Sequence, residues 1–346
     1  NNAKLNSKMV YGPYAFLDTQ NDQMGSEKPR LSKFGLPVMV QNQKLGISPL
    51  SWTNQSILEL GDHISYEENI TQAAESGFTG VELGRKFPQD PETVKATLAD
   101  VGLSPVSAWY SGYLGERTAA EEWPAAEPEI MHLKALGCDV VVYGECACGP
   151  AVGARAFLAD TPPLGNIDLV AYAERVTEFA NRVNDVGLTL VYHPHVMMPV
   201  ETVDEIDQFM QVVGPSVRLL LDTGHIAMAG GDYRIVMDKW WDRISHIHLK
   251  DMRQAVFDAI DRKQTTFDQT VHDGIFTVPG DGDLNFEPLI QKIAKNGYDG
   301  WLLVEAEQDP LKAPPQIMAK TAFTYLSGML EKYNLPFERN SACENH

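Results

Sequence analysis

The sequence predicts an α/β fold, a (β/α)₈ barrel in which eight parallel strands alternate with helices. Short β-rich runs recur eight times, and an amphipathic helical pattern follows most of them. Several runs are continuously apolar, as in strands that are buried on both faces, and a helix-ending glycine precedes several of them. An open, doubly wound sheet is the alternative. However, the sequence lacks the early glycine-rich phosphate turn that is typical of that fold.

The elements follow one another in regular order. The predicted strands are Lys44–Trp52, Gly80–Gly84, Ser104–Ser111, Asp139–Glu145, Leu188–His195, Val217–His225, Ser245–Asp251 and Trp301–Asp309. Predicted helices between them include Tyr66–Glu75, Pro91–Ala99, Ile167–Val186 and Val203–Val213. The helix-ending glycines are Gly77, Gly102, Gly137, Gly187 and Gly297.

These elements define one catalytic barrel domain over residues 44–334, after an N-terminal extension over 1–43 and before a C-terminal tail over 335–346. The region Met252–Asn285 is too long for an ordinary loop, so we expect it to be irregular and to act as a lid or a subunit contact. A final helix over Ala319–Tyr333 is expected to cap the barrel or to pair two subunits.

Composition excludes several classes of function. The formal net charge of −19 disfavours nucleic acid and anionic membrane as partners. No run of 18 apolar residues is present, and four cysteines in 346 residues do not make a disulfide framework. We therefore expect a cytoplasmic protein with a small-molecule substrate.

Ionisable side chains gather at the predicted strand ends, where active sites of (β/α)₈ barrels lie. Five of the nine histidines fall on three consecutive strands. Buried charged groups in such a ring are costly unless a cation lies among them. The strand-end residues are Glu82, Glu145, His193, His195, Asp222, His225, His248, Lys250, Asp251, Glu305 and Glu307.

We select one metal ligand from each of the last four strands: His193, Asp222, His248 and Glu305. Imidazole and carboxylate together suit Mn²⁺ or Co²⁺, with Fe²⁺ or Zn²⁺ as alternatives. Where two candidates share a strand face, we choose the one nearer the layer of Asp222. Any one of the four alone is more often a structural group, so the prediction rests on their occurrence together.

Other residues have weaker signals. Glu82 and Glu145 are candidates for binding substrate hydroxyls or shuttling protons, or each pairs with a neighbour such as Arg85. Lys250 would stabilise an enolate or form a salt bridge with Asp251, which is itself a candidate for orienting His248. Candidates for further substrate contacts are Arg253 and an aromatic wall of Trp109 and Tyr110, for which ordinary barrel packing is the alternative.

The motifs at the strand ends resemble a known superfamily. Asp222-Thr-Gly-His225, His246-Ile-His-Leu-Lys-Asp251 and Val304-Glu305 resemble the xylose isomerase-like sugar isomerases and epimerases, which hold one divalent metal in a TIM barrel. Within it, the chain is similar to the inosose dehydratases from about Leu45 to Pro310. The segments concerned are Ser51–Asn54, Gly80–Gly84, Ala108–Gly112, Tyr192–His195, Val200–Thr202, Phe276–Gly282 and Gly300–Pro310. His193 stands where most of the superfamily has a glutamate ligand, a departure that the dehydratases share.

The resemblance implies a hydro-lyase that eliminates water from the cyclic keto-polyol 2-keto-myo-inositol, giving a trihydroxycyclohexane-1,2-dione. It suggests Glu305 as ligand and base, His195 or His225 as the acid, and Lys250 and Glu145 as substrate contacts. It also implies a homo-oligomer. The main alternative is an isomerase or epimerase with the same enediolate chemistry. A DNA-repair endonuclease would need a basic face and more histidines on the early strands, and a non-catalytic polyol-binding barrel would not need so many polar strand ends.

Overall fold

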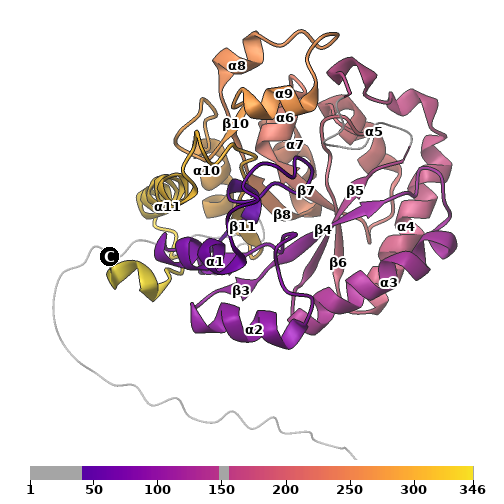
Figure 1. Ribbon diagram of the computed structural model, residues 1–346. Coiled ribbons are helices and arrows are strands. Elements are labelled where there is room, and N and C mark those ends of the chain that lie inside the picture. Colours follow the sequence, from indigo (N-terminus) through magenta and orange to yellow (C-terminus); the bar gives the residue numbers. More distant parts are fainter. Residues whose placement is uncertain (1–40, 148–155, 346) are drawn as a thin grey trace, which may run out of the picture. The chain divides into compact units, whose positions relative to one another are not determined.

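The computed structural model describes residues 41–147 and 156–345 (Figure 1). Nearly all of the predicted N-terminal extension therefore lies outside the described residues. Within the described ranges, no helix has both the length and the apolar composition that crossing a membrane requires.

The strands form one parallel sheet that closes into a barrel, which confirms the predicted fold. Strand order around the sheet is β3-β2-β1-β11-β8-β7-β6-β5-β4. β3 and β4 are two parts of one predicted strand, separated by Val106. The backbone N–H of Val106 donates to Val81, and that of Leu83 donates to Ser107, so hydrogen bonds to β2 continue across the break and exclude an open sheet. The bounds are β1 Lys44–Ile47, β2 Gly80–Val81, β3 Ser104–Pro105, β4 Ser107–Gly112, β5 Val140–Glu145, β6 Thr189–Tyr192, β7 Arg218–Asp222, β8 Ile244–Leu249 and β11 Trp301–Val304.

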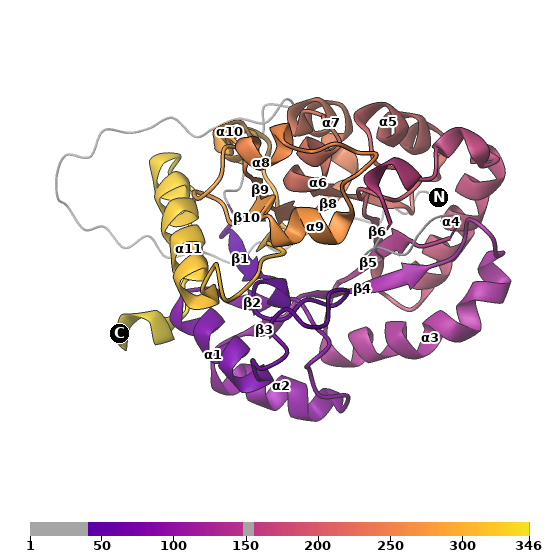
Figure 2. The same ribbon diagram turned by 45° about the horizontal axis from the view of Figure 1, so that its top comes forward.

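Helices cover the outside of the barrel (Figures 1 and 2). Their starts follow local signals: Ser65 accepts a hydrogen bond from the N–H of Glu68, and Thr118 forms a capping box with Glu121. Gly137 ends α3 with φ 85°, a conformation that glycine adopts without strain. The bounds are α1 Tyr66–Glu75, α2 Pro91–Asp100, α3 Ala119–Leu136, α4 Leu169–Asp185, α5 Val203–Val212, α6 Thr223–Met228, α7 Tyr233–Trp240, α10 Glu287–Asn296 and α11 Pro315–Lys332.

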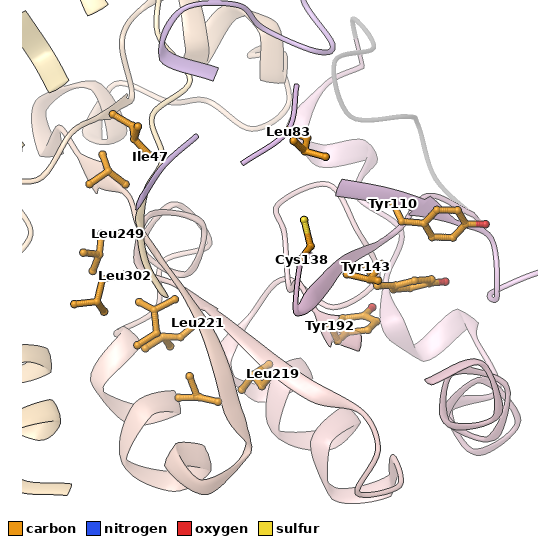
Figure 3. Packing of buried hydrophobic residues seen from close by; sticks show 14 of the residues in the cluster. Ile47, Leu83, Tyr110, Cys138, Tyr143, Tyr192, Leu219, Leu221, Leu249 and Leu302 are labelled. Carbon is orange, nitrogen blue, oxygen red and sulfur yellow. The ribbon is translucent and has the colours of Figure 1, made fainter. Parts of the chain in front are cut away.

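The main hydrophobic core lies between the sheet and the helices. Alternate residues of each strand enter it, among them Leu219 and Leu221 of β7 and Tyr143 of β5 (Figure 3). The residues between them face the barrel axis, where Val142, Val191 and Leu220 form a separate small cluster. This period of two decides which strand-end side chains can meet inside the barrel.

One irregularity changes the phase of β8. Leu219 pairs with Ile244 but Leu220 pairs with His246, so Ser245 is an extra residue in the ladder. Ile244 therefore packs in the outer core, whereas His246 and His248 face inward. The same shift places His248 directly beside Asp222.

The region predicted to be irregular, Met252–Asn285, contains regular structure. β9 Asp251–Met252 and β10 Phe276–Thr277 pair in antiparallel fashion, and α8 Gln254–Asp258 and α9 Phe267–His272 lie between them. Phe267, Val271, Ile275 and Phe276 are fully buried in a second hydrophobic cluster with residues of other loops. This insertion is therefore a packed wall beside the strand ends.

The predicted tail also makes specific contacts. Gln43, just before β1, exchanges backbone hydrogen bonds with Pro336 and Glu338. The Asn340 amide donates to the carbonyls of Val101 and Gly102. Residues 336–340 thus fasten the C-terminus to the end of the barrel where β1 and β3 begin.

Candidate active site at the carboxyl ends of the strands

Inward-facing side chains from five strands converge at one end of the barrel. Each belongs to the inward phase of its strand, so the chain sends it toward the axis and away from the helices. All are almost fully buried, with at most 5% of the residue exposed. They are Glu82, His193, Asp222, His248 and Glu305.

The four predicted ligands lie close together. His193 Nε2 is 3.3 Å from Asp222 Oδ2. His248 Nδ1 is 3.6 Å from that same oxygen and 3.0 Å from Glu305 Oε2. The structure thus brings together two imidazoles and two carboxylates, one from the end of each of β6, β7, β8 and β11.

The donor set fits a divalent metal ion. His193, Asp222 and His248 each offer a ligand atom, and these atoms lie within 4.8 Å of one another, as do those of Asp222, His225 and Glu305. Neither ring nitrogen of His248 makes an aligned hydrogen bond, although the ring is buried among carboxylates. Buried nitrogens without an aligned hydrogen bond are costly, and an ion among them would remove that cost. Two nitrogens and two carboxylate oxygens are ordinary ligands of first-row divalent metals.

Lys250 is the buried cation of the site. Its Nζ lies 2.6 Å from Glu305 Oε1, 3.2 Å from Glu307 Oε1 and 2.8 Å from His225 Nε2. Burial by itself would lower the pKa of Lys250, but the neighbouring carboxylates outweigh it and raise that pKa. Lys250 therefore stays an ammonium group and donates to His225.

Two histidines beside Lys250 are neutral. The rings of His195 and His225 lie 3.6 Å apart between centroids. Burial, with His193 and Lys250 acting in the same direction, lowers the pKa of His195 to about 3. Burial and the neighbouring His195 and Lys250 also hold the pKa of His225 well below its usual range.

The two carboxylates of the last strand differ. Burial would raise the pKa of Glu305, but Lys250 and His248 together hold it well below its usual range. Burial raises the pKa of Glu307, and Lys250 offsets this only in part. Asn54 Nδ2 lies 3.5 Å from Glu307 Oε2.

A pocket of about 150 Å³ opens onto this cluster. Five predicted site residues line it: Glu82, Trp109, His193, His195 and Glu305. Asp222, His225, His248 and Lys250 lie in contact with these, as the distances above show. Sequence reasoning gave no role to several other lining residues, among them Asn54, Tyr113 and Cys146, and did not select Glu307. Glu307 shares the inward face of Glu305, and Asn54 lies in a segment that resembles the dehydratases, so a signal for each was present.

Trp109 forms one wall of the pocket. Its ring meets His193 edge-on, with centroids 5.5 Å apart at 90°, and its Nε1 donates to Ser111 Oγ. Gly144 makes room for the indole, because a Cβ there would lie 2.0 Å from the ring. Tyr110 has the opposite phase: it donates to Glu122 and stacks on Phe179 among the helices. Of the predicted aromatic wall, Trp109 alone faces the pocket.

Two predicted substrate contacts lie away from the pocket. Glu145 ends β5 in the outward phase, where it accepts hydrogen bonds from the N–H groups of Gly115 and Ala147 and from the Tyr143 hydroxyl. Arg253 donates to the Gly274 carbonyl and pairs with Asp281, so it fastens the insertion.

Asp251 was a candidate for orienting His248. It instead accepts hydrogen bonds from the backbone N–H groups of residues 252, 280, 282 and 284. Its carboxylate therefore holds the turn that follows β10.

Comparisons with known proteins show the family to which the chain belongs. The xylose isomerase-like TIM barrel family matches residues 70–326. The rhizopine catabolism protein MocC of Rhizobium meliloti is 38% identical over 286 residues, which cover 83% of this chain and 88% of MocC. An inosose dehydratase of Mesomycoplasma hyopneumoniae is 37% identical over 293 residues, covering 84% of this chain and 97% of that protein.

Among solved structures, a crystal structure of the IolI protein with a bound zinc atom aligns with a TM-score of 0.61. The alignment covers 84% of this chain and 99% of that one at 14% identity. Identity this low supports the shared barrel fold and no more.

Proposed function

The chain belongs to the xylose isomerase-like TIM barrel family and to its inosose dehydratase branch, and we propose that it is a hydro-lyase of inositol catabolism. It removes water from 2-keto-myo-inositol and leaves a trihydroxycyclohexane-1,2-dione. The observation that supports this most strongly is the ring of His193, Asp222, His248 and Glu305 beside a pocket, in a chain that is 37% identical to an inosose dehydratase over 293 aligned residues.

We propose that these four residues hold a divalent metal ion, Mn²⁺ or Co²⁺, with Fe²⁺ and Zn²⁺ as alternatives. When bound, such an ion supplies Lewis acidity toward the ketone oxygen and an adjacent hydroxyl. Glu305 fits the ligand role best, because its two oxygens already face His248 and Lys250.

His195 is placed to accept the proton next to the ketone. Its Nδ1 lies 2.6 Å from the Val196 carbonyl and donates to it, so Nε2 presents a lone pair from a ring that lines the pocket. In this tautomer Nε2 has a lone pair and no proton, so it can accept a proton from the pocket but has none to donate there. The geometry thus favours proton removal by His195, where the sequence suggested donation to the leaving hydroxyl.

The leaving hydroxyl needs a proton as the C–O bond breaks. Glu307 lines the pocket, and burial raises its pKa, so its carboxyl group can pass a proton to the hydroxyl, which leaves as water. Exchange of protons with solvent then restores His195 and Glu307. His225 accepts from Lys250 and thereby keeps that ammonium group in place.

Trp109 would lie against the carbon face of the cyclic substrate, as aromatic rings commonly do in sites for polyols. The isomerase or epimerase alternative shares the enediolate stage, but the similarity to inosose dehydratases does not favour it. An endonuclease is disfavoured by the net charge of −19.

Three further parts of the proposal concern the cell. We propose a cytoplasmic enzyme, which agrees with the free thiols of Cys138, Cys146 and Cys343. We propose that it works without nucleic-acid or membrane partners. We also propose a homo-oligomer that forms through the outer helices.

The test is to follow dione formation from 2-keto-myo-inositol by ultraviolet absorbance. Protein stripped by a chelator is compared with protein given back Mn²⁺ or Co²⁺, and with His193→Ala and Glu305→Ala. The exposed His63→Ala and Glu127→Ala serve as matched controls. We expect turnover that needs the metal and both site residues. Turnover that survives the chelator would disprove the metal-dependent mechanism, and an isomerised product without the dione would support the epimerase.

A further inference from the structure

The ring of His248 has carboxylates on both sides. Nδ1 faces Glu305 at 3.0 Å and Asp222 at 3.6 Å, two of the proposed metal ligands. Nε2 points the other way and lies 3.5 Å from Glu82 Oε2. The ring is 1% exposed, so water does not replace these neighbours.

A neutral imidazole carries one proton and one lone pair, and a metal ion takes the lone pair. Because Nδ1 of His248 faces the other proposed ligands, a bound ion would take the lone pair of Nδ1. The proton of the neutral ring is then on Nε2. Among the ion pairs of the described residues, the carboxylate on the Nε2 side is that of Glu82. Which nitrogen keeps the proton is set by what the other ring nitrogen meets.

We propose that Glu82 is a positioning residue, which accepts the Nε2–H of His248 and so fixes the tautomer and the orientation of that ligand. The inference rests on the proposed metal site. It changes the role that the sequence suggested for Glu82, which was contact with a substrate hydroxyl or proton transfer.

Glu82 is itself held in place. The Ser107 hydroxyl donates to Glu82 Oε2 at 2.7 Å, and Ser107 is fully buried. Glu82 follows β2 and Ser107 begins β4, and the backbone hydrogen bond from Leu83 to Ser107 joins the two segments. The carboxylate therefore cannot turn away without leaving the Ser107 hydroxyl without its acceptor. The 3.5 Å separation is long for a hydrogen bond, and we expect it to shorten when an ion fixes Nδ1.

His246 offers a competing arrangement. It lies two residues before His248 on the same inward face, it is fully buried, and neither of its ring nitrogens has a hydrogen-bond partner. Ligand atoms of Glu82, His246 and His248 lie within 4.8 Å of one another, so these three could hold a second ion. That ion would need a lone pair on His248 Nε2, and an imidazole already bound through Nδ1 gives up its last proton only at high cost. We therefore favour the positioning role, and the number of bound ions decides between the two.

The experiment measures Co²⁺ binding to the full chain after removal of metal, without substrate. The variants are Glu82→Ala, Glu82→Gln and the exposed control Glu127→Gln. We expect Glu82→Ala to weaken Co²⁺ binding by roughly 10- to 100-fold and to shift the visible absorption bands of the bound Co²⁺. Glu82→Gln keeps an amide oxygen that can accept the Nε2–H, so it should restore most of the affinity.

A second measurement covers the case in which Glu82→Ala folds poorly. In the Zn²⁺-loaded unaltered protein with ¹⁵N-labelled histidine, NMR should show a proton on His248 Nε2 and none on Nδ1. The opposite tautomer would overturn the proposal.

Two binding results would also overturn it. Unchanged Co²⁺ affinity and spectrum in Glu82→Ala, with a raised KM, would make Glu82 a substrate ligand. Two ions per chain, falling to one in both Glu82→Ala and His246→Ala, would establish the second site. Because binding is read without inosose, a failed dehydratase assay would leave this result interpretable.

Discussion

The carboxyl ends of β5 and β6 lie side by side, and each has an ionisable side chain, yet the two side chains have different surroundings. His193 follows β6 and faces the barrel axis among Asp222, His248 and Trp109. Glu145 ends β5 and faces the helices, where three donors hold it. Tyr143 pairs with Tyr192, so the residue level with His193 is Gly144 and not Glu145. A difference of one residue in phase separates a group that can take part in chemistry from one that holds loops together.

The largest expected effect is on turnover, at the inward-facing residue His193. His193→Ala should lower the rate of dione formation on the order of a thousandfold, since a bound metal ion contributes several kcal/mol to such a reaction. The measurement is turnover together with metal content per chain. His193→Glu, which restores a ligand of the kind most of the superfamily has there, should recover metal binding. A fully active His193→Ala would remove His193 from the site.

The next largest effect is expected on protein stability, at the outward-facing residue Glu145. Glu145→Ala leaves the N–H groups of Gly115 and Ala147 and the Tyr143 hydroxyl without their acceptor, so unfolding free energy should fall by about 3 kcal/mol. Turnover per folded molecule should stay within a few fold. Urea unfolding of this variant and of Glu127→Ala measures the first part. A large loss of kcat at unchanged stability would instead give Glu145 the substrate role that the sequence suggested.

Gly144 makes the comparison sharper, because it is the inward neighbour of Glu145. A Cβ at this position would lie 2.0 Å from the Trp109 ring, so Gly144→Ala should displace the indole and act like Trp109→Ala. Both should raise KM by roughly tenfold, the effect of about 1.4 kcal/mol of lost contact. The double variant should be no worse than either single one. Additive effects in the double variant would show that Gly144 acts independently of Trp109.

The smallest effect is expected at Arg253, the other predicted substrate contact that lies outside the pocket. Its ion pair with Asp281 is about one third exposed on each side, so Arg253→Ala should cost at most about 1 kcal/mol of stability. KM should not change. A raised KM with unchanged stability would mean that the insertion moves Arg253 toward the substrate.

The candidate site was predicted correctly at those strand ends whose selected side chains face the barrel axis. His193, Asp222, His248 and Glu305 come from four strands whose order around the barrel follows their order along the chain, so choosing one from each strand was enough. The choice of His248 over His246 depended on Asp222, and the ladder does place Asp222 beside His248. That pairing arises from the extra residue Ser245, which the sequence does not mark.

Phase was not predictable for strands that are apolar on both faces. β5 reads Val140-Val-Val-Tyr-Gly-Glu145, and nothing in that run distinguishes its inward side from its outward side. Glu145 and Gly144 were therefore equally good candidates for the pocket side until packing was known. The insertion was underestimated for a related reason, because its helices α8 and α9 have five and six residues and are stabilised by contacts with other loops.

The sequence by itself determined the eight strand–helix units, because buried apolar runs, helix caps and terminal glycines are local signals. It also determined which residue types end the strands and which segments resemble the inosose dehydratases. Only the tertiary structure decided which of those residues face one another. Closure of the sheet sets the stagger of neighbouring strands. A shift of one residue in that stagger moves a side chain from the inside of the barrel to the outside.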